Sequence, residues 1–538
     1  MVAVPWLLPG FIFGTDWPGP RRIDWPAELS SGAPVQALLA ATSAAFSAEL
    51  ATKLLVVTFL FIAALSAYRA LPVGDFVPRA AASIIYTFNP FVYGRLHYGQ
   101  FLLLAGYALL PWVAARAFRV LAQPDVRQGL ILALSLALVA TFTLHLLLPA
   151  ILLLATSAGA IVISQWRSVA YVLRLGRAIA ACAGAFVVLS AYWLIPYLGG
   201  RSVEGNIIAQ LGSGDLAAYS SVPDRALGLF PNLLGLYGFW AEDVQRFPSL
   251  KLFVPYWPLA LLALLALAGL GTAFVFFARS SALRELRWWV MGLLLAGIIA
   301  VILEAGVAEP HLAPIVRWLD AVFPPYRGMR DAGKWGALLA VMYAQLVPLG
   351  VIVIRKWLQD HTSPVRSIAR AAVTGLALGL PLYYGNGLLF GMHGQIRPST
   401  YPTGWYVVDS VMAADPRHAR ALFLPWHQYL RLSFVRNVNA VVASPAPNFF
   451  SVPVVISADA EVGGIAPPTD PEQRAITTLV AAGAKADWAT ALASRNIKYV
   501  LVANEIDSER FAFLARQPGF VRVLGDDNIA LYRNELLP

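Results

Sequence analysis

The residues with the clearest potential for chemistry lie near the start of the chain, in the stretch "FIFGTDWPGPRRIDWP" from Phe11 to Pro26. This stretch places two acids, Asp16 and Asp24, in a proline-bent segment beside strongly apolar sequence. A carboxylate at the outer edge of a membrane can act as a general base toward a hydroxyl group, or it can hold a divalent cation such as Mg²⁺ or Mn²⁺. The alternative is that Asp16 caps a short helix or only solvates the loop.

A second group of polar residues interrupts the apolar stretch "YTFNPFVYGRLHYGQFLLLAGYALLPW", Tyr86 to Trp112. Its arginine, histidine and glutamine offer donors for a phosphate or a sugar, and its tyrosine rings can stack on a sugar. The alternative is that Asn89–Pro90 ends a helix and that the basic side chains reach lipid head groups. The candidate substrate-binding residues here are Tyr93, Arg95, His97 and Gln100.

A third group stands in "FPPYRGMRDAGKWGALLAVMYAQ", Phe323 to Gln345, just before a predicted spanning helix. Arg330 and Lys334 would lie on the outer side, where basic residues run against the positive-inside trend. Such cations suit the phosphate of a lipid. The alternative is that both residues only pair with Asp331 at the start of the helix.

Two further residues are weaker candidates for substrate binding. His145 falls within an apolar segment, where a polar group is a functional candidate, although a single histidine often only packs with a hydrogen bond. Glu242 could contact a substrate from a large outer loop, or it could simply be solvated.

A metal site could combine Asp16, Asp24 and His97, but their spacing does not require a metal. No phosphate-binding glycine loop or serine-hydrolase elbow is present.

Composition indicates an integral membrane protein. The 538 residues are 58% hydrophobic and 13% charged, about half the charge of a soluble domain. The formal net charge of +10 comes from residues in short loops between apolar runs, which is typical of membrane topology and argues against nucleic-acid binding. The single cysteine, Cys182, excludes an internal disulfide and a cysteine metal site.

The apolar runs predict an α-helical polytopic protein with about eleven transmembrane helices. The first run, Val2–Phe13, is short for a spanning helix and counts as the eleventh only if it crosses the membrane. "HLLLPA", from His145, divides a longer apolar region in two because it contains a polar group and a proline. The other runs cover about 50–70, 77–93, 99–119, 128–144, 146–164, 178–197, 251–278, 288–306, 334–354 and 371–391.

Alternate loops are rich in arginine and lysine, so the positive-inside rule places them in the cytoplasm. The intervening loops, longer and mixed in sign, then lie outside: 14–35, 198–250 and 306–333, with everything after the last helix. If the first run crosses the membrane, the N-terminus lies inside. We therefore expect residues 1–391 to form the transmembrane domain and 392–538 to form a small extracytoplasmic α/β domain.

The C-terminal part has the pattern of a soluble α/β module. "RALFLPW" and "KYVLVAN" predict strands, and "WATALASRNI" and "DSERFAFLARQP" have helical spacing. "FVRVLGDDNIALYRN" predicts a hairpin that turns at Gly525–Asp526–Asp527.

Two segments carry a resemblance to a known family: "FNPFVYGRLHYGQFLLLAGYALLPW" and "YRGMRDAGKWGALLA". They resemble the GT-C superfamily of membrane glycosyltransferases, and more narrowly the transmembrane part of the mycobacterial arabinofuranosyltransferases and their relatives, over roughly residues 5–390. The sequence departs from that family in its short first run, in Gly94 where an acid is usual, and in having one small module in place of a large carbohydrate-binding extension. The resemblance implies Asp16 as catalytic base, with Arg95, Arg330 and Lys334 in the corresponding basic positions.

The resemblance also implies a substrate class. A transferase on the outer face would take its sugar from a polyprenyl-phosphate donor and pass it to a cell-envelope glycan, glycolipid or glycoprotein, with inversion at the anomeric carbon. Its setting would be the lipid bilayer of a bacterial or archaeal plasma membrane. The alternative is a non-enzymatic transporter, flippase or assembly factor for an envelope polymer. The sequence shows no internal repeat of the kind that many transporters have.

Overall fold

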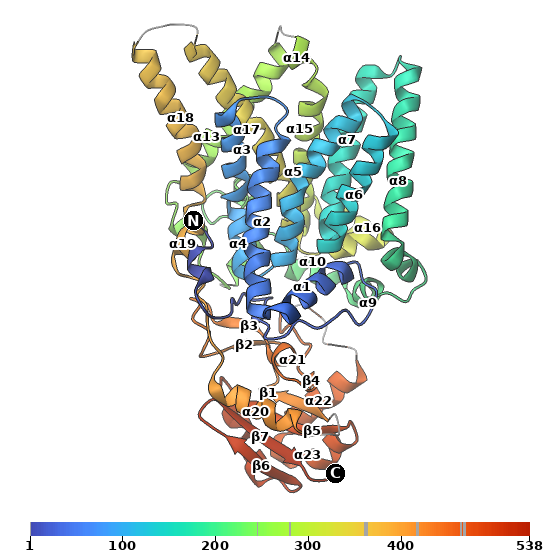
Figure 1. Cartoon of the computed structure of the whole chain (residues 1–538), viewed down its shortest axis with the longest axis vertical. Coiled ribbons are helices and arrows are strands. Elements are labelled where there is room, and N and C mark those ends of the chain that lie inside the picture. The colour runs from blue at the N-terminus through green and yellow to red at the C-terminus, as the bar shows by residue number, and fades with distance from the viewer. Residues whose placement is uncertain are drawn as a thin grey trace.

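The computed structural model describes residues 2–244, 246–278, 281–359, 364–415, 419–462, 465, 468 and 470–538. Its helices form an upright bundle, and a smaller module with a β-sheet lies beyond one end of that bundle (Figure 1). The chain is therefore mostly helical with a small C-terminal sheet region, as the sequence predicts.

Among the described residues, seven helical segments are long and apolar enough to cross a membrane, or eight if the bent pair Ser367–Tyr384 and Asn386–His393 is one span. Two shorter apolar helices, α1 (Ala33–Ala45) and α6 (Val126–Phe142), accompany them. The seven segments are α2 (Ala48–Ala70), α5 (Phe101–Ala122), η2 with α7 (Leu144–Gln165), α8 (Val169–Leu198), α13 (Trp257–Phe277), α15 with η4 (Arg287–Ala308) and η6 with most of α17 (Ala332–Leu358).

The first predicted run does not form a spanning helix. Only the single turn η1 (Val4–Leu7) is helical there. Two prolines and Gly10, whose φ is +120°, keep the rest extended. The backbone carbonyl of Val2 accepts a hydrogen bond from the Gly391 amide at 2.8 Å. The expectation of an eleventh crossing in Val2–Phe13, and with it an N-terminus on the opposite side from the C-terminal module, is therefore wrong for this segment.

The second predicted run is also interrupted, at Asn89, into α3 (Phe76–Thr87) and α4 (Pro90–Tyr98). The Asn89 Oδ1 atom accepts from the Val92 amide at 3.0 Å, and its Nδ2 group donates to the Ile85 and Tyr86 carbonyls. This one side chain both ends α3 and caps α4, because an asparagine cap satisfies orphan groups at a helix end. Asn89–Pro90 thus ends a helix, as one interpretation of the sequence proposed.

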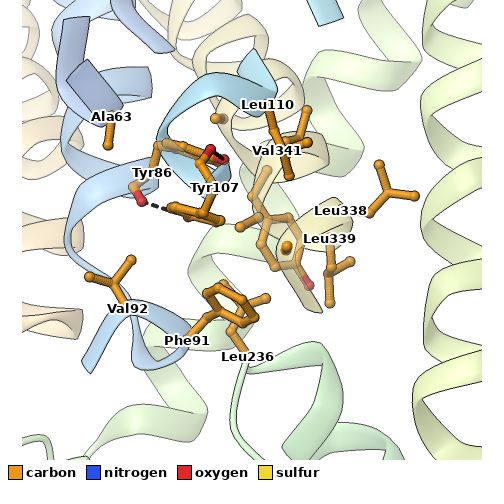
Figure 2. Close-up of a cluster of buried hydrophobic side chains, with 14 of the residues drawn as sticks. Ala63, Tyr86, Phe91, Val92, Tyr107, Leu110, Leu236, Leu338, Leu339 and Val341 are labelled. Atoms are coloured by element: carbon orange, nitrogen blue, oxygen red, sulfur yellow. Dashed lines mark hydrogen bonds between the residues drawn. The ribbon is translucent and has the colours of Figure 1, made fainter. Parts of the chain in front are cut away.

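A stacked tyrosine pair anchors α3 to α5 in the bundle core (Figure 2). The hydroxyl of Tyr86 donates to the Tyr107 carbonyl at 2.6 Å, and the hydroxyl of Tyr107 donates to the Tyr86 carbonyl at 2.7 Å. Their rings are parallel with centroids 4.1 Å apart, and Phe91 from α4 stacks on Tyr107. Because both hydroxyls are satisfied, this core can bury two polar aromatic residues and hold α4 in place.

The C-terminal module is built on a five-stranded sheet with the order β4-β1-β5-β7-β6. β1 (Arg420–Leu424) runs parallel to β4 (Val454–Val455) and β5 (Ile497–Ala503), and β7 (Ile529–Asn534) is antiparallel to β5 and to β6 (Phe520–Gly525). The predicted strands and hairpin are confirmed. The segment from Ser508 to Arg516 is a 3₁₀ helix, η9.

The remaining elements are shorter or cover the sheet. A small ladder joins β2 (Tyr429–Arg431) to β3 (Val441–Ala443), and α20 (Thr403–Ala413) and α22 (Pro471–Ala482) pack with the sheet's two hydrophobic clusters. The others are α9 (Val203–Gln210), α10 (Ser213–Ala218), α11 (Leu229–Leu234), α12 (Trp240–Asp243), α14 (Ser281–Arg284), α16 (Ala313–Val322), α18 (Pro364–Tyr384), α19 (Leu389–His393), α21 (Ala446–Phe449), α23 (Trp488–Ala493) and the 3₁₀ turns η3 (Leu250–Leu252), η5 (Pro324–Met329), η7 (Asn386–Leu388) and η8 (Gly483–Lys485).

The N-terminal segment 11–22 is part of the module's structure. Phe13 is fully buried in the same hydrophobic cluster as Trp405. The Phe11 amide and carbonyl pair with Ser399 at 2.8 and 2.9 Å, and the Thr15 carbonyl accepts from the Ala443 amide at 2.7 Å. The predicted boundary near residue 392 separates two stretches of sequence, but the module also uses residues from the other end of the chain.

Candidate functional site

Asp16 sits in a tight turn that is packed against the end of α4. The turn is closed by hydrogen bonds between Gly14 and Trp17, and the Asp16 amide donates to the Tyr98 carbonyl at 2.7 Å. A β-carbon on Gly14 would lie 2.4 Å from the Cα atom of Gly99, whose own φ is +81°. Only glycine fits such an approach, so this pair fixes where the Asp16 backbone lies relative to α4.

The carboxyl group of Asp16 is half-buried and hydrogen-bonded. Its Oδ1 atom accepts from the Tyr429 hydroxyl at 2.8 Å. Burial raises the pKa of Asp16 to about 6, an effect that hydrogen bonds from Tyr429 and Gln100 partly offset. A carboxylate with this pKa is mostly ionised at pH 7, yet it is a much stronger base than an ordinary aspartate, as general-base catalysis requires.

Arg95 is fully buried and engaged with protein groups, not free for a phosphate. Its guanidinium forms a two-pronged ion pair with Asp331, with one N–O distance of 3.1 Å, and it donates to Gln100 Oε1 at 2.8 Å. It also lies over the ring of Phe239 at 3.9 Å. Because Gln100 in turn reaches Asp16, Arg95 holds the side chain next to the candidate base.

Arg330 is the accessible cation of the third group. Its guanidinium donates to Asp215 Oδ1 at 2.8 Å and lies 4.7 Å from the centre of the Tyr219 ring, with 35% of the side chain exposed. The proposed salt-bridge cluster of Arg330 and Lys334 with Asp331 is not what forms, since Asp331 pairs with Arg95 across 236 positions.

Lys334 and His145 lie close together, and the Lys334 side chain is more buried than Arg330. The Lys334 ammonium is buried and donates to the Gly328 carbonyl at 3.1 Å. A β-carbon on Gly328 would lie 3.6 Å from Nδ1 of His145. Asp16 interacts electrostatically with both Asp331 and Lys334. The structure therefore brings Asp16, Arg95, Gln100, Lys334 and His145 into one polar cluster.

Tyr93 and His97 are not part of this cluster; both contact Gln395. Oε1 of Gln395 accepts from the Tyr93 hydroxyl at 2.9 Å and lies 2.8 Å from Nε2 of His97. Burial lowers the pKa of His97 to about 4, so the ring is neutral at pH 7. Its face stacks on Phe247 with centroids 5.3 Å apart. These two side chains join α4 to the segment that leads into the C-terminal module.

Asp24 and Glu242 are separate from the cluster. The Asp24 carboxylate is 63% exposed and lies 3.5 Å from the Arg22 guanidinium, which is the simpler role that a loop acid can have. Glu242 lines a cavity of about 700 Å³ with Lys251 and Asn439. Lys251 is held there by Asp224 at 2.6 Å.

The three candidate metal ligands are not brought together. Asp16 bonds to Tyr429, Asp24 faces Arg22, and His97 faces Gln395. In the part of the chain that the structure describes, no group of three or more histidine, cysteine, aspartate or glutamate side chains has the geometry of a metal site. A site composed of these three residues therefore does not fit a divalent cation.

Sequence reasoning missed an aromatic wall beside Asp16. Tyr98 packs edge-on against Trp240 with centroids 5.3 Å apart, and Tyr219 does the same at 4.7 Å. The Arg246 guanidinium lies over the Tyr429 ring, 5.7 Å from its centre. These side chains come from α4, the 198–250 loop and the module, so no local spacing marks them as a group. Aromatic side chains with a few polar groups are the usual lining of a small-molecule site.

Comparison with known protein families gives no match, and comparison with curated proteins gives none either. Solved structures do match. The structure of arabinofuranosyltransferase AftD from Mycobacteria superposes with a TM-score of 0.59 at 16% sequence identity, over 99% of this chain and 39% of that one. Two further structures, both of a mutant of that enzyme, match with TM-scores of 0.57 and 0.55 at 16% and 15% identity, each over 99% of this chain and 41% of the other.

The protein is a multi-pass membrane protein that shares its fold with AftD, a GT-C enzyme. The resemblance predicted from the sequence is thus confirmed at the level of the fold. The chain spans about two-fifths of the length of the structures that it matches.

Proposed function

We propose that this protein is a membrane glycosyltransferase of the GT-C type. It moves a sugar from a polyprenyl-phosphate donor to a glycan, glycolipid or glycoprotein of the cell envelope, on the outer face of a bacterial or archaeal plasma membrane. The observation that carries the proposal is the Asp16 carboxyl, whose pKa of about 6 suits a general base, held beside a cationic cluster and an aromatic wall.

Asp16 activates the acceptor. Its Oδ1 atom is occupied by Tyr429, so the second carboxylate oxygen takes the proton of the acceptor hydroxyl. As that proton leaves, the hydroxyl oxygen forms a bond to the anomeric carbon, and the bond from that carbon to the donor phosphate breaks. Attack from the face opposite the phosphate inverts the anomeric centre. The products are a glycoside, polyprenyl phosphate and a proton, which Asp16 passes to solvent.

Arg330 and Lys334 meet the donor phosphate. Arg330 is the more exposed of the two, and the buried Lys334 adds a positive charge just behind it. Charge-assisted bonds to a phosphate are stronger than neutral ones, and they strengthen further as the leaving group gains charge. Arg95 has a different role. The ion pair with Asp331 holds the Arg95 guanidinium, which donates to Gln100 and so positions the side chain that reaches the base.

The substrate's sugar lies against the partly exposed rings of Tyr219 and Tyr429, since Tyr98 and Trp240 are themselves buried. Acceptor chains extend toward the cavity that Glu242 lines between the outer loop and the module, where Asn439 also contributes. His145, close to Lys334, adds a polar group on the donor side. Tyr93 and His97 do not contact the substrate. Through Gln395 they hold α4 against the segment that leads into the module.

The outer-face assignment follows from charge. The basic loops lie at the end of the bundle away from the C-terminal module (Figure 1), and the positive-inside rule places that end in the cytoplasm. The module, Asp16 and Arg330 then face outward. No nucleotide sugar is present there, so a lipid-linked donor is the chemically available source.

Reconstitution tests the enzyme class against the non-enzymatic one. The full-length protein in liposomes is given a panel of polyprenyl-phosphate sugars with candidate acceptors, and two quantities are measured: release of polyprenyl phosphate and movement of intact donor between leaflets. A transferase releases polyprenyl phosphate only when acceptor is present. Movement of intact donor with no release, across the whole panel, would instead identify a transporter or flippase.

A further inference from the structure

A second cationic pocket lies at the opposite end of the bundle from Asp16. The C-terminal end of α5 meets the N-terminal ends of α6 and α8 there, away from the module (Figure 1). The three ends surround a cavity of about 740 Å³, lined by Arg119, Arg174, Gln123 and Gln128 among others. A smaller cavity next to it shares Arg119 and adds Arg69 and Arg116.

The charge in these two cavities is not neutralised by protein. Among the described residues, no carboxylate lies within ion-pair distance of Arg69, Arg116, Arg119 or Arg174. The one acid in the lining, Asp125, uses its carboxylate to cap α6 through the Arg127 amide at 3.0 Å. Within the described residues, four guanidinium groups thus line two cavities that share Arg119, and none of the four has a carboxylate partner.

The pocket also offers groups that hold a ligand in one orientation. Oε1 of Gln128 is buried and has no hydrogen-bond partner within the described structure, so it can accept from a hydroxyl group of a ligand but not from its phosphate. The Tyr171 hydroxyl is fixed to the Leu121 carbonyl at 2.8 Å, so its ring forms a rigid wall, and Arg116 lies 4.7 Å over the ring of Trp112. Guanidinium groups bind phosphate oxygens in a two-pronged manner, which a point charge does not.

We propose that this pocket binds the phosphodiester head group of an anionic phospholipid, in the leaflet at the basic end of the bundle. The arginines stand at the ends of helices apolar enough to span, which is the depth at which lipid phosphates lie. Arg119, shared by both cavities, contacts the phosphate, and Arg174 closes over it from α8. The site is independent of the proposed transferase reaction.

Native mass spectrometry of the full-length protein tests this assignment. Binding of phosphatidylglycerol and of phosphatidylcholine is measured for the wild type, for Arg119→Gln/Arg174→Gln, and for the matched control Arg127→Gln/Arg177→Gln, which removes the same charge at the same end outside the cavity. Each interfacial arginine contributes a factor of about five, so the first variant should lose roughly 25-fold in phosphatidylglycerol affinity. The control should lose clearly less affinity than the cavity variant, because Arg127 and Arg177 do not line either cavity and cannot contact a head group held there.

Three outcomes would overturn the proposal. Equal loss in both variants would mean diffuse charge attraction. Equal affinity of the wild type for the two lipids would exclude a head-group site, even if the cavity variant failed to fold. Displacement of phosphatidylglycerol by an equal concentration of glycerol phosphate would show that a free phosphate ester is the ligand, not a lipid.

Discussion

Removal of one hydroxyl group, by Tyr429→Phe, should shift the pH dependence of the reaction without removing the base. The Tyr429 hydroxyl donates to Asp16 at 2.8 Å, and this bond lowers the pKa of the carboxyl. A hydrogen bond to a charged group contributes about 1.5–3 kcal/mol in a buried site, and Asp16 is only half-buried, so we take the lower end. That corresponds to a rise of about one pKa unit, to roughly 7.

The direction of the change in activity follows from the ionisation state of Asp16 that is catalytically active. The base is active when ionised, so the acidic limb of kcat/KM against pH reports the pKa of Asp16 in the free protein. A rise from about 6 to roughly 7 lowers the ionised fraction about twofold at pH 7 and about eightfold at pH 5.5. The activity of the variant should approach that of the wild type above roughly pH 8.

The assay is the transfer rate over pH 5–9, with Tyr406→Phe as the control because that ring is partly exposed and packs on Arg21 and Phe449, not on Asp16. In the control variant, the acidic limb of kcat/KM should lie at the same pH as in the wild type. If Tyr429→Phe also left the acidic limb where it is in the wild type, Asp16 would not be the group that titrates. A uniform loss at every pH would instead point to a positioning role for Tyr429.

Three other expectations test different parts of the structure. Arg330→Ala should raise KM for the donor by about tenfold or more while kcat changes less, as expected for a ground-state phosphate contact, and a fall in kcat alone would contradict that role. Phe13→Ala should destabilise the module by about 3–5 kcal/mol because the ring is fully buried there, which thermal unfolding of the full chain measures; an unchanged midpoint would show that the N-terminal segment is not part of that core. With Cys182 replaced by alanine, a cysteine at position 123 should resist an impermeant thiol reagent in intact cells and one at position 508 should react, and the reverse pattern would overturn the outer-face assignment.

Local sequence signals were sufficient for most of the helices. Asn89 before a proline predicts a break, and the structure has one, because the asparagine side chain caps the next helix with its own oxygen. The apolar segment Val2–Phe13 is an exception. Its hydropathy suits a helix, but its prolines and its pairing with Ser399 and Gly391 hold it extended. Tertiary contacts of that kind leave no mark on local composition.

The candidate site was only partly predictable for the same reason. Asp16 could be found because an acid beside prolines in apolar sequence is unusual. Its hydrogen-bond donor Tyr429 is 413 positions away, and the ion-pair partner of Arg95 is 236 positions away. Spacing cannot reveal such pairs. The role of Arg95 therefore changes from a phosphate ligand to a residue that positions Gln100.

The central claim is that Asp16 is the general base, and the transfer rates of two variants test it most directly. Asp16→Asn keeps the shape of the side chain but cannot accept a proton, so transfer from a polyprenyl-phosphate sugar should fall about 10²–10⁴-fold while donor binding is retained. Asp24→Asn, in the same segment but 63% exposed, should stay close to the wild type. Full activity in Asp16→Asn, whatever the second variant does, would contradict the account.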